Sequence, residues 1–178
     1  VYLTDAELDK YQLYTSKIIQ NIVKRKDKTI VTNLAKEFML KRARLVAGAS
    51  EKIEKLREMA NDFKNEKNML IYCGATNVQG YDNCSDDDIR QIDYISRMLN
   101  FDFGMRTAQF TSREDSKERK RRLEEFQNGE IQALIAIKCL DEGVNVPAIK
   151  TAYILASTTN PKEYIQRRGR VLRLYPGK

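Results

Sequence analysis

Histidine is absent from this chain of 178 residues. Its absence excludes a Ser-His-Asp triad, a histidine general base and every histidine-ligated metal. Three cysteines, Cys73, Cys84 and Cys139, show no paired spacing of the kind that binds a metal. Cys73 and Cys139 lie in apolar segments, where buried free thiols are expected. We therefore assign no metal ligand and expect a reducing, cytoplasmic setting.

Long apolar runs are also missing. No stretch approaches the roughly 20 residues that a membrane span needs, so no membrane partner is expected. The phosphate-binding pattern G-x-x-x-x-G-K-[ST] does not occur either, so the chain cannot cradle a nucleoside triphosphate by that loop. Because the first residue is Val1 rather than Met, we expect a piece of a longer protein.

Charge is plentiful and unevenly placed. The chain is 42% hydrophobic and 32% charged, which suits a packed core under a hydrated surface. The net charge of +7 comes from the two ends of the chain. Residues 1–68 hold fifteen basic and ten acidic side chains, residues 161–178 hold six and one, and the middle is slightly acidic. Basic ends of this kind favour the binding of a polyanion, either nucleotide phosphates or a nucleic-acid backbone.

The first part of the chain, residues 1–67, predicts a helical extension or connector. Thr4 and Glu7 have the spacing of a capping box, and apolar residues follow at helical spacing as far as Ile22. After a break at 26–28, a second helix is expected over about 33–47, ended by Gly48. Ser50 is expected to cap a third helix. No catalytic constellation is found in this part.

From residue 68 to 178 the pattern changes to short apolar runs that alternate with helices. Strands are expected over 69–73, 104–110, 133–137 and 152–155. Helices are expected over 86–99 and from 112 or 114 to 126. Continuous apolar strands separated by helices predict an α/β fold, a parallel sheet with helices on both faces. Ligands of such sheets bind at the carboxyl ends of the strands, which makes that edge the candidate site.

The segment 166–173, Gln-Arg-Arg-Gly-Arg-Val-Leu-Arg, is the most informative stretch of the sequence. Arg170 and Arg173 lie three residues apart, so on a helical turn they project from the same side. Guanidinium groups are preferred where planar, bidentate contact with phosphate oxygens is needed. The pair therefore suits the charge of a γ-phosphate in transfer.

Three blocks in order, 69–76, 133–147 and 166–173, resemble motifs IV, V and VI of superfamily 2 helicases and translocases of the DEAD/DEAH type. Residues 110–112 with Arg119, Leu123, Phe126 and Gly129 resemble the motif between IV and V. Block 140–147 is closest to the branch of excision-repair helicases and restriction-system motors. The resemblance covers residues 69–178 and implies a RecA-like C-terminal lobe.

The resemblance also implies roles for the residues of motifs V and VI. In such motors the first lobe holds ATP with Mg²⁺, and the second completes the site across a cleft. Arg170 and Arg173 would be arginine fingers, Gln166 would contact the γ-phosphate, and Arg167 would hold motif VI in place. The motif V residues expected at the nucleotide are Glu142, Gly143 and Asn145. The family usually has aspartate at position 145, so weaker nucleotide coupling is expected.

Nucleic-acid contacts are expected from the ends of the strands. Thr76, Thr111, Ser112 and Lys138 offer hydroxyl, N–H and ammonium donors to phosphates and no means of reading bases. DNA is the expected substrate, with RNA left open. The other expected partner is the upstream lobe of the same polypeptide, and the restriction-motor branch adds nuclease or methylase subunits.

Two functions remain open at this point. The first is an ATP-dependent helicase or translocase, of which this isolated piece would be inactive because the phosphate loop lies elsewhere. The second is a non-catalytic, helicase-like binding or scaffold module. Asn145 favours the second and the intact arginine pair favours the first.

Overall fold

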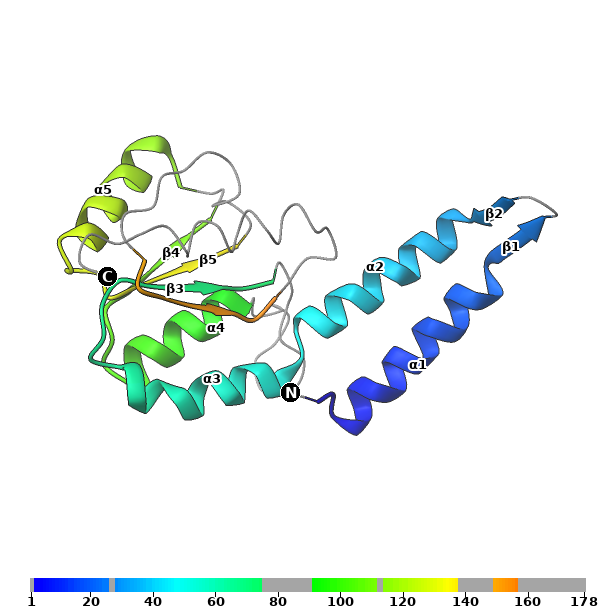
Figure 1. Cartoon of the computed structure of the whole chain (residues 1–178), viewed down its shortest axis with the longest axis horizontal. Coiled ribbons are helices and arrows are strands. Elements are labelled where there is room, and N and C mark those ends of the chain that lie inside the picture. Colours follow the sequence, from blue (N-terminus) through cyan, green and yellow to red (C-terminus); the bar gives the residue numbers. More distant parts are fainter. Residues whose placement is uncertain (1, 26–27, 75–90, 112–113, 138–148, 157–178) are drawn as a thin grey trace, which may run out of the picture.

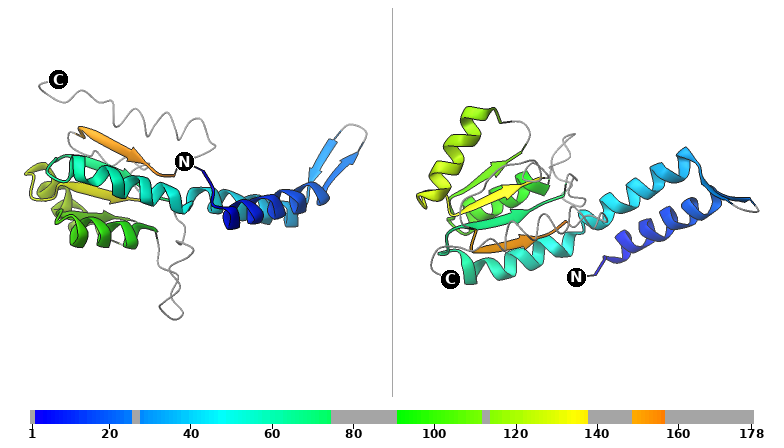
Figure 2. Two further views of the ribbon diagram at one scale, coloured as in Figure 1. Left: turned by 90° about the horizontal axis from the view of Figure 1, so that it is seen from below. Right: turned by 45° about the horizontal axis from the view of Figure 1, so that its top comes forward.

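The computed structural model describes residues 2–25, 28–74, 91–111, 114–137 and 149–156. Two parts are distinguished in Figure 1. Residues 2–47 form an arm of two antiparallel helices with a β-hairpin at its outer end. The other described residues form a body, a sheet with helices packed on it. The arm extends away from the body in each view of Figure 2.

The arm consists of four elements: α1 (Asp5–Gln20), β1 (Ile22–Arg25), β2 (Lys28–Val31) and α2 (Asn33–Ala47). The capping box predicted at Thr4 and Glu7 is confirmed, and so are the predicted bounds of α2. The hairpin was not predicted. The sequence analysis expected only a break there, but β-branched residues on both sides of the turn pair as antiparallel strands, with Ile22 opposite Val31.

The body contains a four-stranded parallel sheet in the order β4-β5-β3-β6, which confirms the predicted α/β class. Strands β3 and β5 lie in its centre, and all eight of their residues are buried. The elements are α3 (Ser50–Phe63), β3 (Met69–Tyr72), α4 (Gln91–Arg97), the π-helix η1 (Met98–Asp102), β4 (Thr107–Phe110), α5 (Ser116–Gln127), β5 (Ala133–Ala136) and β6 (Thr151–Ile154).

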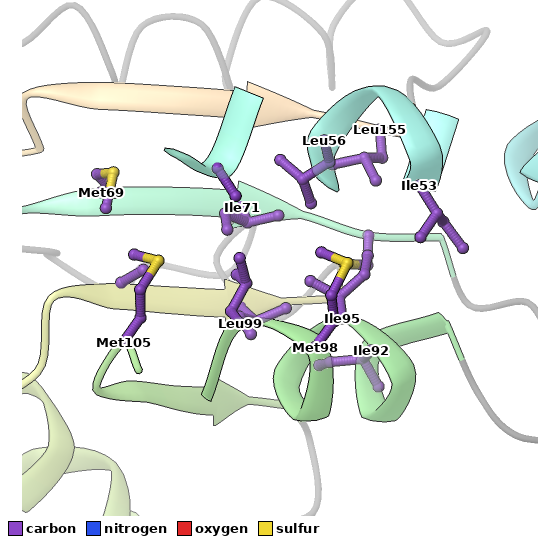
Figure 3. Close-up of a cluster of buried hydrophobic side chains, with 14 of the residues drawn as sticks. Ile53, Leu56, Met69, Ile71, Ile92, Ile95, Met98, Leu99, Met105 and Leu155 are labelled. Carbon is purple, nitrogen blue, oxygen red and sulfur yellow. The ribbon is translucent and has the colours of Figure 1, made fainter. Parts of the chain in front are cut away.

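Side chains on the two faces of the sheet form two separate cores. Ile71 points to the face covered by α3 and α4, where it meets Leu56, Ile95 and Leu99 (Figure 3). Ile135 belongs to the same core. The alternate strand residues point to the face that carries α5, and there they pack with Phe110 and Phe126. Because successive strand residues face opposite sides, burial on both faces explains the continuous apolar runs in the sequence.

Helix α3 packs in the first core although it precedes the domain boundary predicted at 67/68. Ile53, Leu56, Ala60 and Phe63 are buried against the sheet side chains. The cap predicted at Ser50 is wrong, because Ala49 occupies the N-cap and makes no side-chain hydrogen bond there. The boundary itself stays a prediction, while the packing joins α3 to the body.

Strand β4 lies at the edge of the sheet among the described strands, and side chains cover part of its backbone. The amide N–H of Thr107 donates to Asn100 Oδ1 over 3.1 Å. The carbonyl oxygen of Gln109 accepts a hydrogen bond from Arg122 Nη1. Occupied backbone groups discourage the addition of a further strand.

Candidate functional site

The carboxyl ends of the four parallel strands lie at one edge of the sheet, as predicted. The residues that follow the strands there are Cys73 and Gly74 after β3, Thr111 after β4, Ile137 after β5 and Leu155 after β6. We call this line of strand ends the site edge. In the sequence, the rest of motif IV follows Gly74 and the rest of motif V follows Ile137, so the described part of each motif ends at this edge.

Gln91, at the start of α4, connects the site edge to the arm. Its side chain is fully buried. Its Oε1 accepts from the Gly74 amide over 2.8 Å, and its Nε2 donates to the carbonyl oxygen of Ala47, at the end of α2, over 3.3 Å. One amide therefore joins the end of β3 to the end of the second arm helix. The sequence analysis did not identify Gln91, because no local pattern marks this role.

Thr111 is the one predicted site residue that lies within the described residues, and it is 9% exposed. Its amide N–H and its Oγ1 both donate to Glu114 Oε2, over 2.7 and 3.0 Å. Its carbonyl oxygen accepts from Arg119 Nη2 over 3.0 Å. The donors expected to meet a phosphate are thus engaged by a carboxylate, and a phosphate would have to displace Glu114.

Glu114 was missed by the sequence analysis, although a usable signal existed. Thr111 and Glu114 have the T-x-x-E spacing of a capping box, in which the acidic side chain bonds back to the first residue's N–H. Glu114 is itself held by Arg122, whose Nη1 lies 3.0 Å from Glu114 Oε1. Both side chains are mostly buried, so this ion pair fixes the carboxylate at the site edge.

The basic run on α5 forms intrahelical ion pairs. Arg121 pairs with Glu118 and Glu125, and Arg122 pairs with Glu118 as well. Hydrogen bonds from Arg121 and Arg122 lower the pKa of Glu118 to about 2. The helix therefore presents alternating charges rather than a cationic strip.

The cleft between β4 and α5 has the same mixed character. It encloses about 390 Å³. Its lining includes Gln109, Glu114, Arg122 and Glu125. Since carboxylates and guanidinium groups both reach it, the cleft does not favour an anionic ligand.

Cys73 confirms the prediction of a buried free thiol. It is 5% exposed, and burial raises its pKa well above the usual range, so the thiol stays protonated and unreactive. Among the residues that the structure describes, no group of three potential metal ligands is found. Within the same residues, no helix is long and apolar enough to cross a membrane.

The other predicted site residues lie outside the described residues. They belong to motifs IV, V and VI and to the start of the motif between IV and V: Thr76, Ser112, Lys138, Glu142, Gly143, Asn145, Gln166, Arg167, Arg170 and Arg173. Their roles at the nucleotide and at nucleic acid therefore stay predictions. Gly74, the last described residue after β3, lies two positions before Thr76 in the sequence. Ile137, the last described residue after β5, directly precedes Lys138.

Comparison with known proteins gives a family match. The family described as the helicase conserved C-terminal domain matches residues 51–175. This range contains α3 except for its first residue, contains the four-stranded sheet, and leaves out the arm. The DNA 3'-5' translocase XPB2 of Sulfurisphaera tokodaii is 29% identical over 130 residues, which are 72% of this chain and 25% of that protein. The chain thus spans about a quarter of the length of this relative.

Solved structures show the same fold at low sequence identity. The Escherichia coli DEAD-box protein SrmB aligns with a TM-score of 0.52 and 13% identity, covering 71% of this chain and 65% of that one. The yeast DEAD-box splicing factor Prp28 aligns with a TM-score of 0.52 and 17% identity, covering 67% and 23%. The likeness confirms the predicted RecA-like fold of the body.

Proposed function

Because this chain belongs to the family of helicase conserved C-terminal domains, we propose that it is the second motor lobe of an ATP-dependent DNA translocase. The observation that carries the proposal is the site edge, where the paired parallel strands β3 and β5, which begin motifs IV and V, end next to each other. A motor lobe of this kind needs nucleotide-facing and nucleic-acid-facing residues on the loops that follow its strands. DNA is the proposed track because XPB2 of Sulfurisphaera tokodaii is a DNA translocase.

In this proposal, motif VI supplies the charge that the transfer of a phosphoryl group requires. Arg170 and Arg173 stabilise the γ-phosphate as arginine fingers, Gln166 contacts the same group, and Arg167 holds the motif in place. In motif V, Gly143 allows a tight turn, while Glu142 and Asn145 face the nucleotide. These assignments rest on the motif pattern of the sequence.

The upstream lobe of the same polypeptide would provide the phosphate-binding loop and the carboxylates that hold Mg²⁺. This chain has no such loop, so we propose that it does not hydrolyse ATP alone. Closure of the two lobes would bring its arginines to the nucleotide. We also propose that the protein belongs to the branch of excision-repair helicases and restriction-system motors. Its further partners would then be nuclease or methylase subunits, and its location the cytoplasm.

On the nucleic-acid side, Thr76, Thr111, Ser112 and Lys138 would contact phosphates from the site edge. The hydrogen bonds of Thr111 to Glu114 add a condition to this role. A phosphate reaches the Thr111 donors only when Glu114 moves, and Glu114 is held by Arg122. Such contacts follow a backbone without reading its sequence.

A second function, a non-catalytic helicase-like scaffold, has one observation in its favour. Asn145 stands where the family usually has aspartate, so a charge that would pair with arginine is missing. The arginine pair of motif VI opposes this alternative, because a scaffold has no need of it.

The two functions are distinguished by replacing the arginines in the protein that joins this chain to its upstream lobe. Arg170→Ala and Arg173→Ala are each expected to lower kcat of the DNA-stimulated ATPase by about 10³ or more, with ATP affinity largely kept. Lysine at these positions should restore little, because a point charge cannot reproduce the planar fork.

Arg121→Ala is the matched control, since Arg121 is an exposed arginine of α5 in intrahelical ion pairs. Its kcat should stay at the wild-type value. Wild-type turnover in both motif VI variants would show that the arginines are structural. A parent protein without ATPase activity would favour the scaffold.

A further inference from the structure

The arm carries an excess of basic residues over residues 10–44, which we call its outer part. From residue 10 to residue 44 the sequence holds ten lysines and arginines and two acidic residues, Asp27 and Glu37. The other three acidic residues of the arm precede residue 10, at the end of α1 that adjoins the body (Figure 1). Two carboxylates cannot neutralise ten cations, so the outer part of the arm is strongly positive.

This distribution differs from that of α5, where basic residues are denser still but acidic partners accompany them. There Glu118 and Glu125 pair with Arg121, and Glu118 and Glu114 pair with Arg122. In the outer part of the arm, Glu37 pairs with Lys41 over 2.7 Å, and the sequence offers one further acidic residue there. The arm cations Lys17, Lys36 and Arg44 are exposed. Unbalanced exposed cations attract a polyanion, whereas balanced ones do not.

The dimensions of the arm suit a duplex. Helix α1 has 16 residues, about 24 Å at 1.5 Å per residue. The four-residue strand β1 adds about 13 Å. The sum of about 37 Å corresponds to roughly eleven base pairs at 3.4 Å each. A duplex of this length or longer would therefore run along the whole arm.

Two buried side chains hold the inner end of the arm against the body. Glu7, which is 7% exposed, accepts at Oε2 from the Thr4 amide and at Oε1 from the Ser50 amide, each over 3.0 Å. The carboxylate thus caps α1 and meets the first residue of α3. Gln91 joins Ala47 to Gly74, as described above. Both bridges lie where the arm meets the body, and that of Gln91 reaches the site edge.

We propose that the outer part of the arm is a second contact surface for duplex nucleic acid, and that Glu7 and Gln91 hold this surface at a fixed position relative to the site edge. This inference rests on the proposed function of the body, since the site edge provides the first contact. One duplex would then bind the motor lobe and the arm together. The two contacts act as linked binding events, whose combined affinity depends on their geometry.

The surface is tested by changing charge at three exposed arm positions in the protein that carries both lobes. The variant combines Lys17→Gln, Lys36→Gln and Arg44→Gln. Its control combines Lys55→Gln, Lys64→Gln and Lys120→Gln, three exposed lysines of the body, and has the same net charge. Binding of labelled duplex DNA of about 30 and about 8 base pairs is titrated at several salt concentrations.

For the arm variant, affinity for the long duplex should fall by roughly tenfold or more. The slope of log affinity against log salt should flatten by about two to three units, as expected for three lost phosphate contacts. Binding of the short duplex, and all binding by the body variant, should change little. Equal losses in the two variants, or none in the arm variant, would overturn the inference.

The positioning role of Gln91 is tested with Gln91→Glu. A carboxylate still accepts from the Gly74 amide but cannot donate to Ala47. The control is Gln132→Glu, a second buried amide that accepts from the Arg106 amide and donates to Lys64 and Glu66, away from the arm. Gln91→Glu should reduce the ratio of long-duplex to short-duplex affinity several-fold, and Gln132→Glu should leave it unchanged.

The failure of this inference can be told apart from the failure of the proposed function. If the wild-type protein shows no ATPase stimulation by DNA and no binding of the short duplex, the motor assignment is wrong. In the other case, the wild type shows both ATPase stimulation by DNA and binding of the short duplex. If the ratio of long-duplex to short-duplex affinity is then the same in Gln91→Glu and the wild type, the arm is not positioned through Gln91.

Discussion

The arm and the body are built from similar proportions of apolar residues, yet they bury them very differently. In the body, the residues of β3 and β5 are at most 1% exposed. In the described part of the arm, only Glu7, Ile18, Ala35 and Leu45 are buried. Ten of the thirteen exposed large hydrophobic side chains among the described residues belong to the arm.

The difference follows from the number of layers. A sheet covered on both faces buries every side chain of its central strands. Two helices side by side bury one stripe each and leave the remaining faces to solvent. The body therefore has its own cores, neither of which includes an arm residue. The arm depends on the contact between α1 and α2 and on its attachment to the body.

The largest expected effect distinguishes the body core from the arm interface by the same truncation. Leu134 is fully buried in β5, so Leu134→Ala should lower the free energy of unfolding by about 2–5 kcal/mol. Leu45 in α2 is 9% exposed, so Leu45→Ala should lower the free energy of unfolding by less, because the surroundings of Leu45 relax more easily. Urea denaturation measures both, and hydrogen exchange should place the Leu45→Ala effect in the arm.

If both truncations lowered the stability equally and raised exchange throughout the chain, the arm and the body would unfold as one unit. The difference in burial between the arm and the body would then not give the two parts different free energies of unfolding.

An intermediate effect is expected at Glu7, where the arm joins the body. Burial alone would raise the pKa of this carboxyl, but hydrogen bonds from Ser50 and Thr4 outweigh it and lower the pKa below the ordinary value. A lowered pKa means that the stabilisation is complete above the unfolded value of about 4.3 and is lost as pH falls through the folded pKa. Glu7→Gln should therefore destabilise the protein at pH 6 and matter less near pH 3.

The measurement compares urea denaturation of the wild type and of Glu7→Gln at the two pH values. The Ser50 amide proton, followed by nuclear magnetic resonance, reports the titration directly. A stability difference that stayed constant, or grew, toward low pH would contradict the ionised bridge.

The smallest expected effects come from two helix caps of the same kind, one in each part. Thr32 caps α2 in the arm and Asp115 caps α5 in the body, each through a side-chain oxygen. Thr32→Ala and Asp115→Ala should each cost about 1 kcal/mol of local helix stability. Hydrogen exchange in α2 should rise after the first change and in α5 after the second. The reverse pattern would show that the caps act through distant packing.

The sequence by itself determined the class of fold. Apolar runs such as 69–73 and 133–137 have the length and composition of buried strands, and the strands form there because burial on both faces leaves no position for polar residues. Local signals also located α2, which ends at Gly48 as expected. The family match at 51–175 supports the helicase resemblance that the motifs suggested.

Tertiary structure decided what local patterns could not express. The β1-β2 hairpin depends on pairing across a turn, and the place of α3 depends on the sheet beneath it. At the site, Gln91 meets Ala47, which lies 44 residues away in sequence, and Glu7 meets Ser50 across 43. Such bridges form because buried polar groups need hydrogen-bond partners, and the fold brings partners together from distant parts of the chain. Local sequence spacing does not indicate which distant residues will meet.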